Sequence, residues 1–136
     1  MNPAFLDTNV CVYAYDTTET RKRRIARALA ADSVRPLVVS TQVLQEFFNV
    51  VTRRLPATLS HEDAAQATRS WAELPVVASD AGLIHRAVQT VAEHQLSIWD
   101  ALIIEAAVRG GCDVLYTEDL NAGSTIRGVK IIDPFG

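Results

Sequence analysis

Short runs of consecutive apolar residues alternate along the chain with longer segments in which apolar residues recur every three or four positions. A short unbroken apolar run is typical of a strand buried on both faces, whereas the longer spacing is typical of an amphipathic helix. We therefore predict a strand wherever such a run is bounded by polar or turn-forming residues. The predicted strands are residues 4–6, 37–39, 114–116 and 129–132, with a weaker fifth at 75–78.

Five segments carry the helical spacing, and local signals bound most of them. Pro56 ends the second segment, because proline cannot continue a helix. A serine followed three residues later by an acid opens the third segment, and a glycine pair closes the last one. The predicted helices are residues 20–31, 43–55, Ser60 to about Trp71, a segment opening at Ser79-Asp80, and one from Ser97 to Gly110-Gly111.

Strands that alternate with helices over the whole length predict a mainly parallel sheet with helices on both faces. The two adjacent helices between residues 43 and 71 would form a helical hairpin inserted into that plan. No linker or low-complexity segment interrupts the pattern, so we expect residues 1–136 to form a single domain.

The composition, with 49% hydrophobic and 21% charged residues, is that of a soluble globular domain. The net charge of −3 argues against sequence-blind coating of nucleic acid, although a local basic patch remains compatible with it. Cys11 and Cys112 lie far apart and fit no metal-ligand spacing, which favours a reduced, intracellular protein. No basic leader or membrane-spanning segment is recognisable, so we expect a cytoplasmic location.

Acidic residues stand after two of the predicted strands and within two of the predicted helices. Asp7 directly follows the first strand, and Asp119 lies just past a later one. Because the carboxyl ends of parallel strands meet at one edge of a sheet, we expect these two side chains to converge. Glu46 lies on or beside the apolar stripe of the second helix, and Asp100 lies in the first turn of the last helix. Both helices can bring their acids to the same edge.

Such a cluster has a definite chemical consequence. Two carboxylates about 4 Å apart repel by about 4 kcal/mol at an effective dielectric constant of ~20. A shared proton or a bound cation relieves this repulsion, and oxygen ligands without His or Cys select hard ions such as Mg²⁺ or Mn²⁺. Such an ion can bind a phosphodiester and activate a water molecule for in-line attack.

Each acid also has a simpler structural interpretation. Asp100 fits the far position of a capping box with Ser97, Asp119 fits a turn, and Asp7 fits a helix cap. Glu46 is harder to explain in this way, because a carboxylate buried on an apolar stripe is costly without a partner. The conjunction of the four acids carries more weight than any single one.

Four segments resemble the PIN-domain ribonucleases, most closely the VapC-type toxins of bacterial toxin–antitoxin modules. The segments are Phe-Leu-Asp-Thr-Asn at residues 5–9, Val-Leu-Gln-Glu-Phe at 43–47, Trp-Asp-Ala-Leu-Ile at 99–103 and Tyr-Thr-Glu-Asp-Leu at 116–120. The ending Gly-Val-Lys-Ile-Ile-Asp-Pro-Phe at 128–135 is similar to the family's last strand, although many members carry Asn where Asp133 stands. The resemblance implies a three-layer α/β/α PIN-like fold whose central parallel sheet has four or five strands.

The resemblance also implies an endoribonuclease that depends on one or two Mg²⁺ or Mn²⁺ ions. Asp7, Glu46, Asp100 and Asp119 match the family's acidic quartet. Asp7 and Asp100 would be the principal metal ligands, with Asp119 binding directly or through water, while Glu46 would orient water or complete a second metal site. Asn9 and Thr117 match positions whose side chains hold the carboxylates in place. The expected partners are a VapB-type antitoxin, a second copy of the chain in a homodimer, and an RNA substrate such as transfer or ribosomal RNA.

Three alternatives stay open at this point. A PIN nuclease of RNA maturation or decay would carry the same residues, and a PIN domain that has lost catalysis could serve in protein binding. A receiver-type signalling domain also gathers acids at a sheet edge, but it needs an Asp after a mid-chain strand, where this chain has Val39-Ser40-Thr41. Glu118 is expected at the surface, pointing away from Asp119. Basic residues of the first long helix would contact RNA phosphates or form a solvated helix face; they are Arg21, Lys22 and Arg24.

Overall fold

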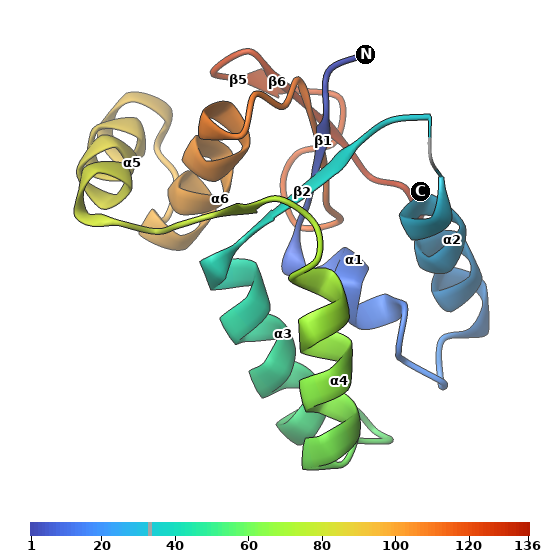
Figure 1. Cartoon of the computed structure of the whole chain (residues 1–136). Helices are drawn as coiled ribbons and strands as arrows, with labels where there is room; N and C mark the ends of the chain where they lie inside the picture. Colours follow the sequence, from blue (N-terminus) through green and yellow to red (C-terminus); the bar gives the residue numbers. More distant parts are fainter. Residues whose placement is uncertain (33) are drawn as a thin grey trace.

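The computed structural model describes residues 1–32 and 34–136, and the strands of these residues form one twisted sheet (Figure 1). Its six strands lie in the order β3-β2-β1-β4-β6-β5. All neighbouring strands are parallel except β5 and β6. The strands are β1 (Ala4–Leu6), β2 (Leu37–Ser40), β3 (Val76–Val77), β4 (Val114–Tyr116), β5 (Thr125–Ile126) and β6 (Val129–Ile132).

The five predicted strands are confirmed, and the sheet contains a further one that the apolar pattern did not predict. This strand, β5, has only two residues, Thr125 and Ile126, and pairs antiparallel with β6. The turn between them places Arg127 and Gly128 at φ values of 55° and 79°. Two positive φ angles in succession are typical of the tightest hairpin turns. A strand of two residues is too short to produce a recognisable alternation.

The predicted helices are confirmed with small shifts of their ends, and one short helix was not predicted. Helix α3 begins two residues earlier than expected because Ser40 caps it, its Oγ accepting a hydrogen bond from the Val43 amide at 3.3 Å. The helices are α1 (Thr8–Tyr13), α2 (Thr20–Ala31), α3 (Thr41–Arg53), α4 (His61–Trp71), α5 (Ala81–His94) and α6 (Ile98–Arg109). The unpredicted helix is α1, which follows β1 directly.

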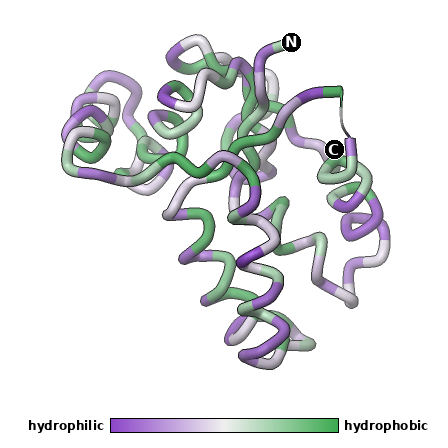
Figure 2. The backbone as a smooth tube through the Cα atoms, viewed as in Figure 1, coloured by the Kyte–Doolittle hydropathy of each residue, from purple (hydrophilic) through white to green (hydrophobic). Residues whose placement is uncertain are grey.

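The helices enclose the sheet in the three layers that the sequence predicted. Figure 1 shows α5 and α6 together on one side of the strands and α2 on the opposite side. Helices α3 and α4 lie side by side and project beyond the strands, forming the expected helical hairpin. In Figure 2 the hydrophobic colours concentrate on the central strands, and much of the tube of α2 carries hydrophilic colours. No helix of residues 1–32 and 34–136 has both the length and the apolar character needed to cross a membrane.

Helix α6 is the central support of the sheet, and residues 101–107 along its middle are all buried. It contacts β2, β4 and β6, and α5 packs against its outer side. Its end passes so close to β2 that a Cβ atom added at Gly110 would lie 3.0 Å from Cγ1 of Val38. That distance is too short for an undisturbed side-chain contact, so glycine permits the close approach.

A buried carboxylate joins α6 to the β5–β6 hairpin. Glu105 is only 2% exposed and accepts hydrogen bonds from Arg127 Nε and Nη2 at 2.9 and 3.0 Å and from the Thr90 hydroxyl at 2.7 Å. Burial alone would raise the pKa of Glu105, but the bonds from Arg127 and Thr90 outweigh it and lower the pKa. The carboxylate is thus charged and fully partnered inside the fold.

Candidate active site

Asp7 occupies the carboxyl end of the central strand β1, where the sheet edge meets the first turn of α1. It serves as the N-cap of α1, since its Oδ1 accepts a hydrogen bond from the Thr8 amide at 2.7 Å. Its Oδ2 accepts a hydrogen bond from the Thr117 hydroxyl at 2.8 Å. The side chain is therefore fixed at both oxygens, and the residue is only 7% exposed. The cap interpretation of Asp7 is confirmed, and it is compatible with a chemical role.

The hydroxyl of Thr117 is the centre of the hydrogen-bond network at this edge. It is fully buried at the end of β4 and accepts hydrogen bonds from Asn9 Nδ2 and from the Asp119 amide, both at 3.1 Å. Asn9 Oδ1 in turn accepts a hydrogen bond from the Glu118 amide at 3.4 Å. Asn9 and Thr117 thus lie where the resemblance placed them, around the acids.

The environment of Asp7 raises its pKa to about 6, and the causes identify its neighbours. Burial is the largest cause, and the charges of Asp119 and Glu46 raise the pKa further. The hydrogen bonds from Thr117 and from the Thr8 amide act in the opposite direction. Three of the four predicted acids therefore lie within electrostatic reach of one another.

Glu46 borders the site from α3, but it is not buried as the sequence predicted. The buried stripe of α3 consists of Val43, Phe47 and Val51, whereas Glu46 itself is exposed beside it. Its Oε1 accepts a hydrogen bond from the Thr8 hydroxyl at 3.3 Å. The expectation of a costly buried carboxylate is wrong for this residue, because the helix turns it outward to the sheet edge.

Asp100 lies at the start of α6, and in the described part of the chain no hydrogen bond joins its side chain to the other three acids. Its amide donates a hydrogen bond to Ser97 Oγ at 3.1 Å, as the capping interpretation predicted. The side-chain Nε2 of Gln42 donates a hydrogen bond to the carbonyl oxygen of Trp99 at 3.4 Å. This bond joins the first turns of α3 and α6. Because α6 runs back to the start of β4, its first turn stands at the same sheet edge as Asp7.

The donor set is suited to a hard divalent cation, although the arrangement is not closed around one. Asp7, Glu46 and Asp119 offer carboxylate oxygens only, which is the chemistry that Mg²⁺ and Mn²⁺ prefer. Within residues 1–32 and 34–136, no three acids, histidines or cysteines lie close enough together to hold an ion. Asp119 is exposed, so its side chain can turn toward an ion without leaving a buried position.

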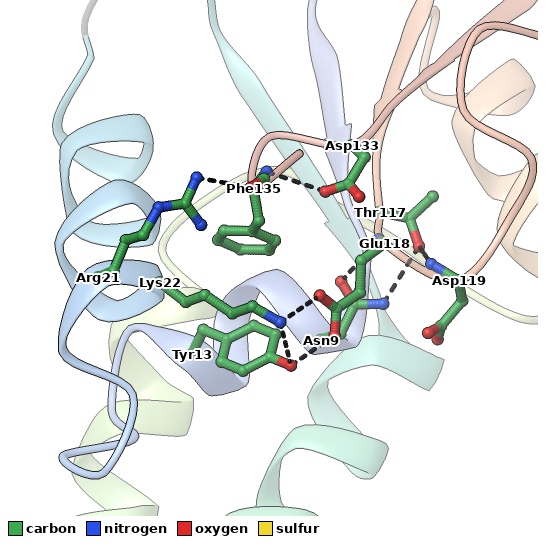
Figure 3. Close-up of polar contacts among 9 residues, drawn as sticks. All are labelled: Asn9, Tyr13, Arg21, Lys22, Thr117, Glu118, Asp119, Asp133 and Phe135. Atoms are coloured by element: carbon green, nitrogen blue, oxygen red, sulfur yellow. Dashed lines mark hydrogen bonds and ion pairs between the residues drawn. The ribbon is translucent and has the colours of Figure 1, made fainter.

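Two of the three basic residues predicted to contact RNA are bonded within the protein. Lys22 Nζ donates hydrogen bonds to Glu118 Oε2 at 2.9 Å and to the Tyr13 hydroxyl at 3.2 Å (Figure 3). Arg21 Nη2 donates to the carbonyl oxygen of Phe135 at 2.8 Å. Arg24 is exposed, and no hydrogen bond or ion pair of its side chain is found in the described part of the chain.

Glu118 and Tyr13 belong to the site region although sequence reasoning did not select them. The Tyr13 hydroxyl donates a hydrogen bond to Glu118 Oε1, so the Glu118 side chain is only 23% exposed rather than at the surface as expected. Figure 3 shows its carboxylate directed to Lys22 and Tyr13, while the carboxylate of Asp119 points away from it. The contacts join residues about a hundred positions apart, and no local pattern in the sequence signals them.

A hollow of about 340 Å³ opens beside the acids, between α1 and α3. Its volume lies at the lower end of the range of roughly 300–1,000 Å³ that is usual for small-molecule sites. The polar residues that line it include two of the predicted acids together with Asp16, which the sequence did not single out. These polar residues are Thr8, Asn9, Asp16, Glu46 and Asp119.

Comparison with known proteins identifies the fold independently. The family model of the PIN domain matches residues 4–125. Among solved structures, a toxin–antitoxin complex from Klebsiella pneumoniae has a TM-score of 0.72 at 18% identity, covering 96% of this chain and 97% of the other. A DNA-bound VapBC from Salmonella typhimurium has a TM-score of 0.69 at 21% identity, covering 98% and 99%.

A third similar structure is a VapC toxin of Mycobacterium tuberculosis, described as cleaving the sarcin-ricin loop. Its TM-score is 0.66 at 21% identity, with 82% of this chain and 86% of the other covered. No curated protein matches the sequence. At these identities the likeness to solved structures concerns the fold.

Proposed function

The chain belongs to the PIN-domain family, and from this premise we propose that it is a divalent-metal-dependent endoribonuclease, the VapC-type toxin of a toxin–antitoxin pair. The observation that carries the proposal is the environment of Asp7. Its carboxyl is buried at the end of the central strand, held by Thr117, and close enough to the charges of Asp119 and Glu46 for both to raise its pKa. A site that gathers negative charge around a buried acid favours a cation.

In this proposal each residue has a distinct task at the sheet edge. Asp7 and Asp100 would be the principal ligands of Mg²⁺ or Mn²⁺, with Asp119 binding directly or through water. The ion, when bound, supplies Lewis-acid activation of a water molecule and of the scissile phosphate. Glu46, exposed beside Thr8, would orient that water. Asn9 and Thr117 hold the carboxylates through the hydrogen bonds described above.

The toxin assignment draws on the similar structures. Two of those structures are toxin–antitoxin complexes, and each match covers nearly the whole of this chain. We infer that this chain pairs with a VapB-type antitoxin, forms a homodimer, and cleaves cytoplasmic RNA such as transfer or ribosomal RNA, thereby inhibiting translation. A PIN nuclease of RNA processing or decay is the second candidate, because the same residues would serve it. A gene for a small antitoxin next to this one would favour the toxin.

The decisive experiment is cleavage of total cellular RNA by the wild type and by Asp100→Asn, each with EDTA, Mg²⁺ or Mn²⁺. Asp63→Asn is a matched control, since the Asp63 amide donates to the cap Ser60 Oγ at 3.1 Å, as the Asp100 amide does to Ser97. We expect discrete cuts by the wild type and the control only when a metal is present, and none by Asp100→Asn. A folded, antitoxin-free wild type that cuts nothing under any condition contradicts the proposal and favours a binding-only PIN domain.

A further inference from the structure

The hollow beside the acids has a wall that metal chemistry does not explain. Beyond Glu46 and Asp119 it is lined by the apolar side chains of Val12, Val50 and Leu55. Apolar surface disfavours a phosphate group or a hydrated ion, because either would lose its water without compensation. This wall suits a flat, largely apolar group that projects from a ligand held at the acids.

Tyr13 completes the wall and is fixed in place before any ligand arrives. Its hydroxyl is bonded to Glu118 and lies 3.2 Å from Lys22 Nζ, and its ring packs edge-to-face against Phe135 with centroids 5.0 Å apart (Figure 3). A side chain held from three directions keeps its rotamer. The hollow is therefore largely preformed, which reduces the ordering cost of binding.

Asp16 provides a polar group in this otherwise apolar part of the hollow. It is only 6% exposed, and its Oδ1 accepts hydrogen bonds from both the amide and the hydroxyl of Thr18, at 2.9 and 2.6 Å. Its Oδ2 has no hydrogen-bond partner in the described part of the chain. Since Oδ1 is occupied, Oδ2 is the acceptor that Asp16 offers to a ligand in the hollow.

We propose that the hollow binds one unstacked nucleobase of the RNA substrate, next to the phosphate that is cleaved, and that Asp16 Oδ2 accepts a hydrogen bond from the exocyclic amine of that base. The inference rests on the proposed ribonuclease function, because it places the base beside the acids. Adenine, cytosine and guanine carry such an amine, whereas uracil has none and offers only its ring N3–H between two carbonyl oxygens, so uracil is disfavoured. Enclosure of single bases by side chains, with hydrogen bonds to their edges, is the usual way in which proteins read RNA sequence.

The substitution Asp16→Asn tests this contact with little change in shape. The amide oxygen of Asn can keep both bonds from Thr18, while its nitrogen replaces Oδ2 and turns an acceptor into a donor. Asp32→Asn is the matched control: Asp32 also accepts a bond from the amide two residues later, that of Val34 at 2.9 Å, and it lies exposed at the other end of α2.

Nucleosides are suitable probes because they carry no phosphate and need no metal. We would titrate cytidine, adenosine and uridine into the isotopically labelled, metal-free protein and follow its NMR spectrum. The wild type and Asp32→Asn should bind cytidine and adenosine about tenfold more tightly than uridine, which one hydrogen bond to a charged group can supply. The shifts should lie at Val12, Tyr13 and Val50. Asp16→Asn should reverse the order of the three nucleosides.

Either of two results of the nucleoside titration would overturn the inference. One is equal affinity for the three nucleosides in both the wild type and Asp16→Asn. The other is tighter binding of N-acetyl-arginine amide than of any nucleoside, which would assign the hollow to a basic side chain of a protein partner. The cleavage assay separates the two proposals. If the protein prefers the expected nucleosides but cuts no RNA, only the nuclease proposal is contradicted. If it cuts RNA and Asp16→Asn leaves its base preference unchanged, only the base contact is contradicted.

Discussion

The Thr117 hydroxyl donates a hydrogen bond to Asp7 Oδ2 at 2.8 Å, and it joins two residues that stand 110 positions apart in the sequence. The same hydroxyl accepts hydrogen bonds from the Asp119 amide and from Asn9. The buried Thr117 side chain therefore orients Asp7 directly and Asp119 through the Asp119 backbone amide. Thr117 is thus the positioning residue of the edge between β1 and β4.

Replacing Thr117 with the nearly isosteric valine should disturb both acids without leaving a cavity. The Asp7 pKa should rise above about 6, because the lost hydrogen bond is one of the interactions that lower it. The free energy of unfolding should fall by about 1–3 kcal/mol, since two donors lose their acceptor. NMR titration of the Asp7 carboxyl and urea unfolding measure the two effects. The control is Thr52→Val, which removes a hydroxyl bonded within α3; an unchanged Asp7 pKa in Thr117→Val would contradict the positioning role.

Asp7 should make the metal-free protein less stable as the pH rises, which is the reverse of ordinary acid denaturation. Its pKa is raised from 3.8 to about 6 by folding, so between these values the folded state binds more protons than the unfolded state. One pKa unit corresponds to about 1.4 kcal/mol, so this group removes about 3 kcal/mol of stability in all, most of it between pH 4 and about pH 7. Denaturant unfolding across this range measures the loss.

Asp7→Asn removes this titration and should be more stable than the wild type at pH 7 without metal. The difference in stability between the two proteins should shrink as the pH falls toward 4. The same variant should not cleave RNA, because it lacks a principal ligand of the proposed ion. A difference that stays constant over this pH range would refute the raised pKa, and cleavage by a scrupulously purified variant would refute the role of Asp7 as a ligand.

Lys22 and Arg24 lie on the same helix and should respond differently to replacement by methionine. Lys22 is committed to Glu118 and Tyr13, so Lys22→Met should lower the free energy of unfolding by about 1 kcal/mol. Arg24→Met should leave stability unchanged and reduce the salt dependence of RNA binding by about one phosphate contact. Urea unfolding and RNA affinity at several salt concentrations distinguish the two. Equal effects on the salt dependence would show that Lys22 also contacts RNA.

Glu105→Gln should separate stability from catalysis. It leaves Arg127 without its buried carboxylate, so the free energy of unfolding should fall by about 3 kcal/mol, while the folded fraction keeps its activity. Because folding lowers the Glu105 pKa, its contribution is present above the unfolded value and is lost as the pH falls, opposite in sign to that of Asp7. Thermal unfolding measures the loss of stability, and activity per folded molecule shows whether catalysis is retained. Arg86→Met removes a longer 3.7 Å pair with Glu105 and an exposed hydrogen bond to Gln89 at 2.8 Å, so it should have a small effect.

The sequence was most informative where the signal was local. Unbroken apolar runs ending in Asp7 or leading to Asp119 predicted both the strands and the edge where these acids meet, because β1 and β4 are buried on both sides. Capping serines likewise marked the starts of α4 and α6, since a cap bond is made within three residues. Helix α1 escaped prediction because it is only six residues long and begins directly after a strand.

Long-range contacts decide the remaining features, and no local pattern encodes them. Glu46 is exposed because α3 borders an open hollow there rather than the core, which its apolar neighbours in the sequence do not reveal. Glu118 is partnered because α1 and α2 bring Tyr13 and Lys22 beside the end of β4. In the sequence Asp16 resembles any other loop acid. Only the structure shows that its Oδ1 is bonded to Thr18 and that the residue lines the hollow.

The close approach of Gly110 to β2 connects the two ends of α6 mechanically. The helix has 12 residues and is thus roughly 18 Å long at about 1.5 Å per residue, with Gly110 after one end and Asp100 in the first turn at the other. A methyl group at position 110 would lie 3.0 and 3.3 Å from Val38 and Val77, so these side chains or the end of the helix would have to shift by a few tenths of an ångström. A shift of the helix end would be carried along α6 to Asp100 at the opposite edge of the sheet. The position of the Asp100 carboxylate is therefore coupled to the absence of a side chain at residue 110, and a substitution there can displace the proposed site without replacing any of its acids.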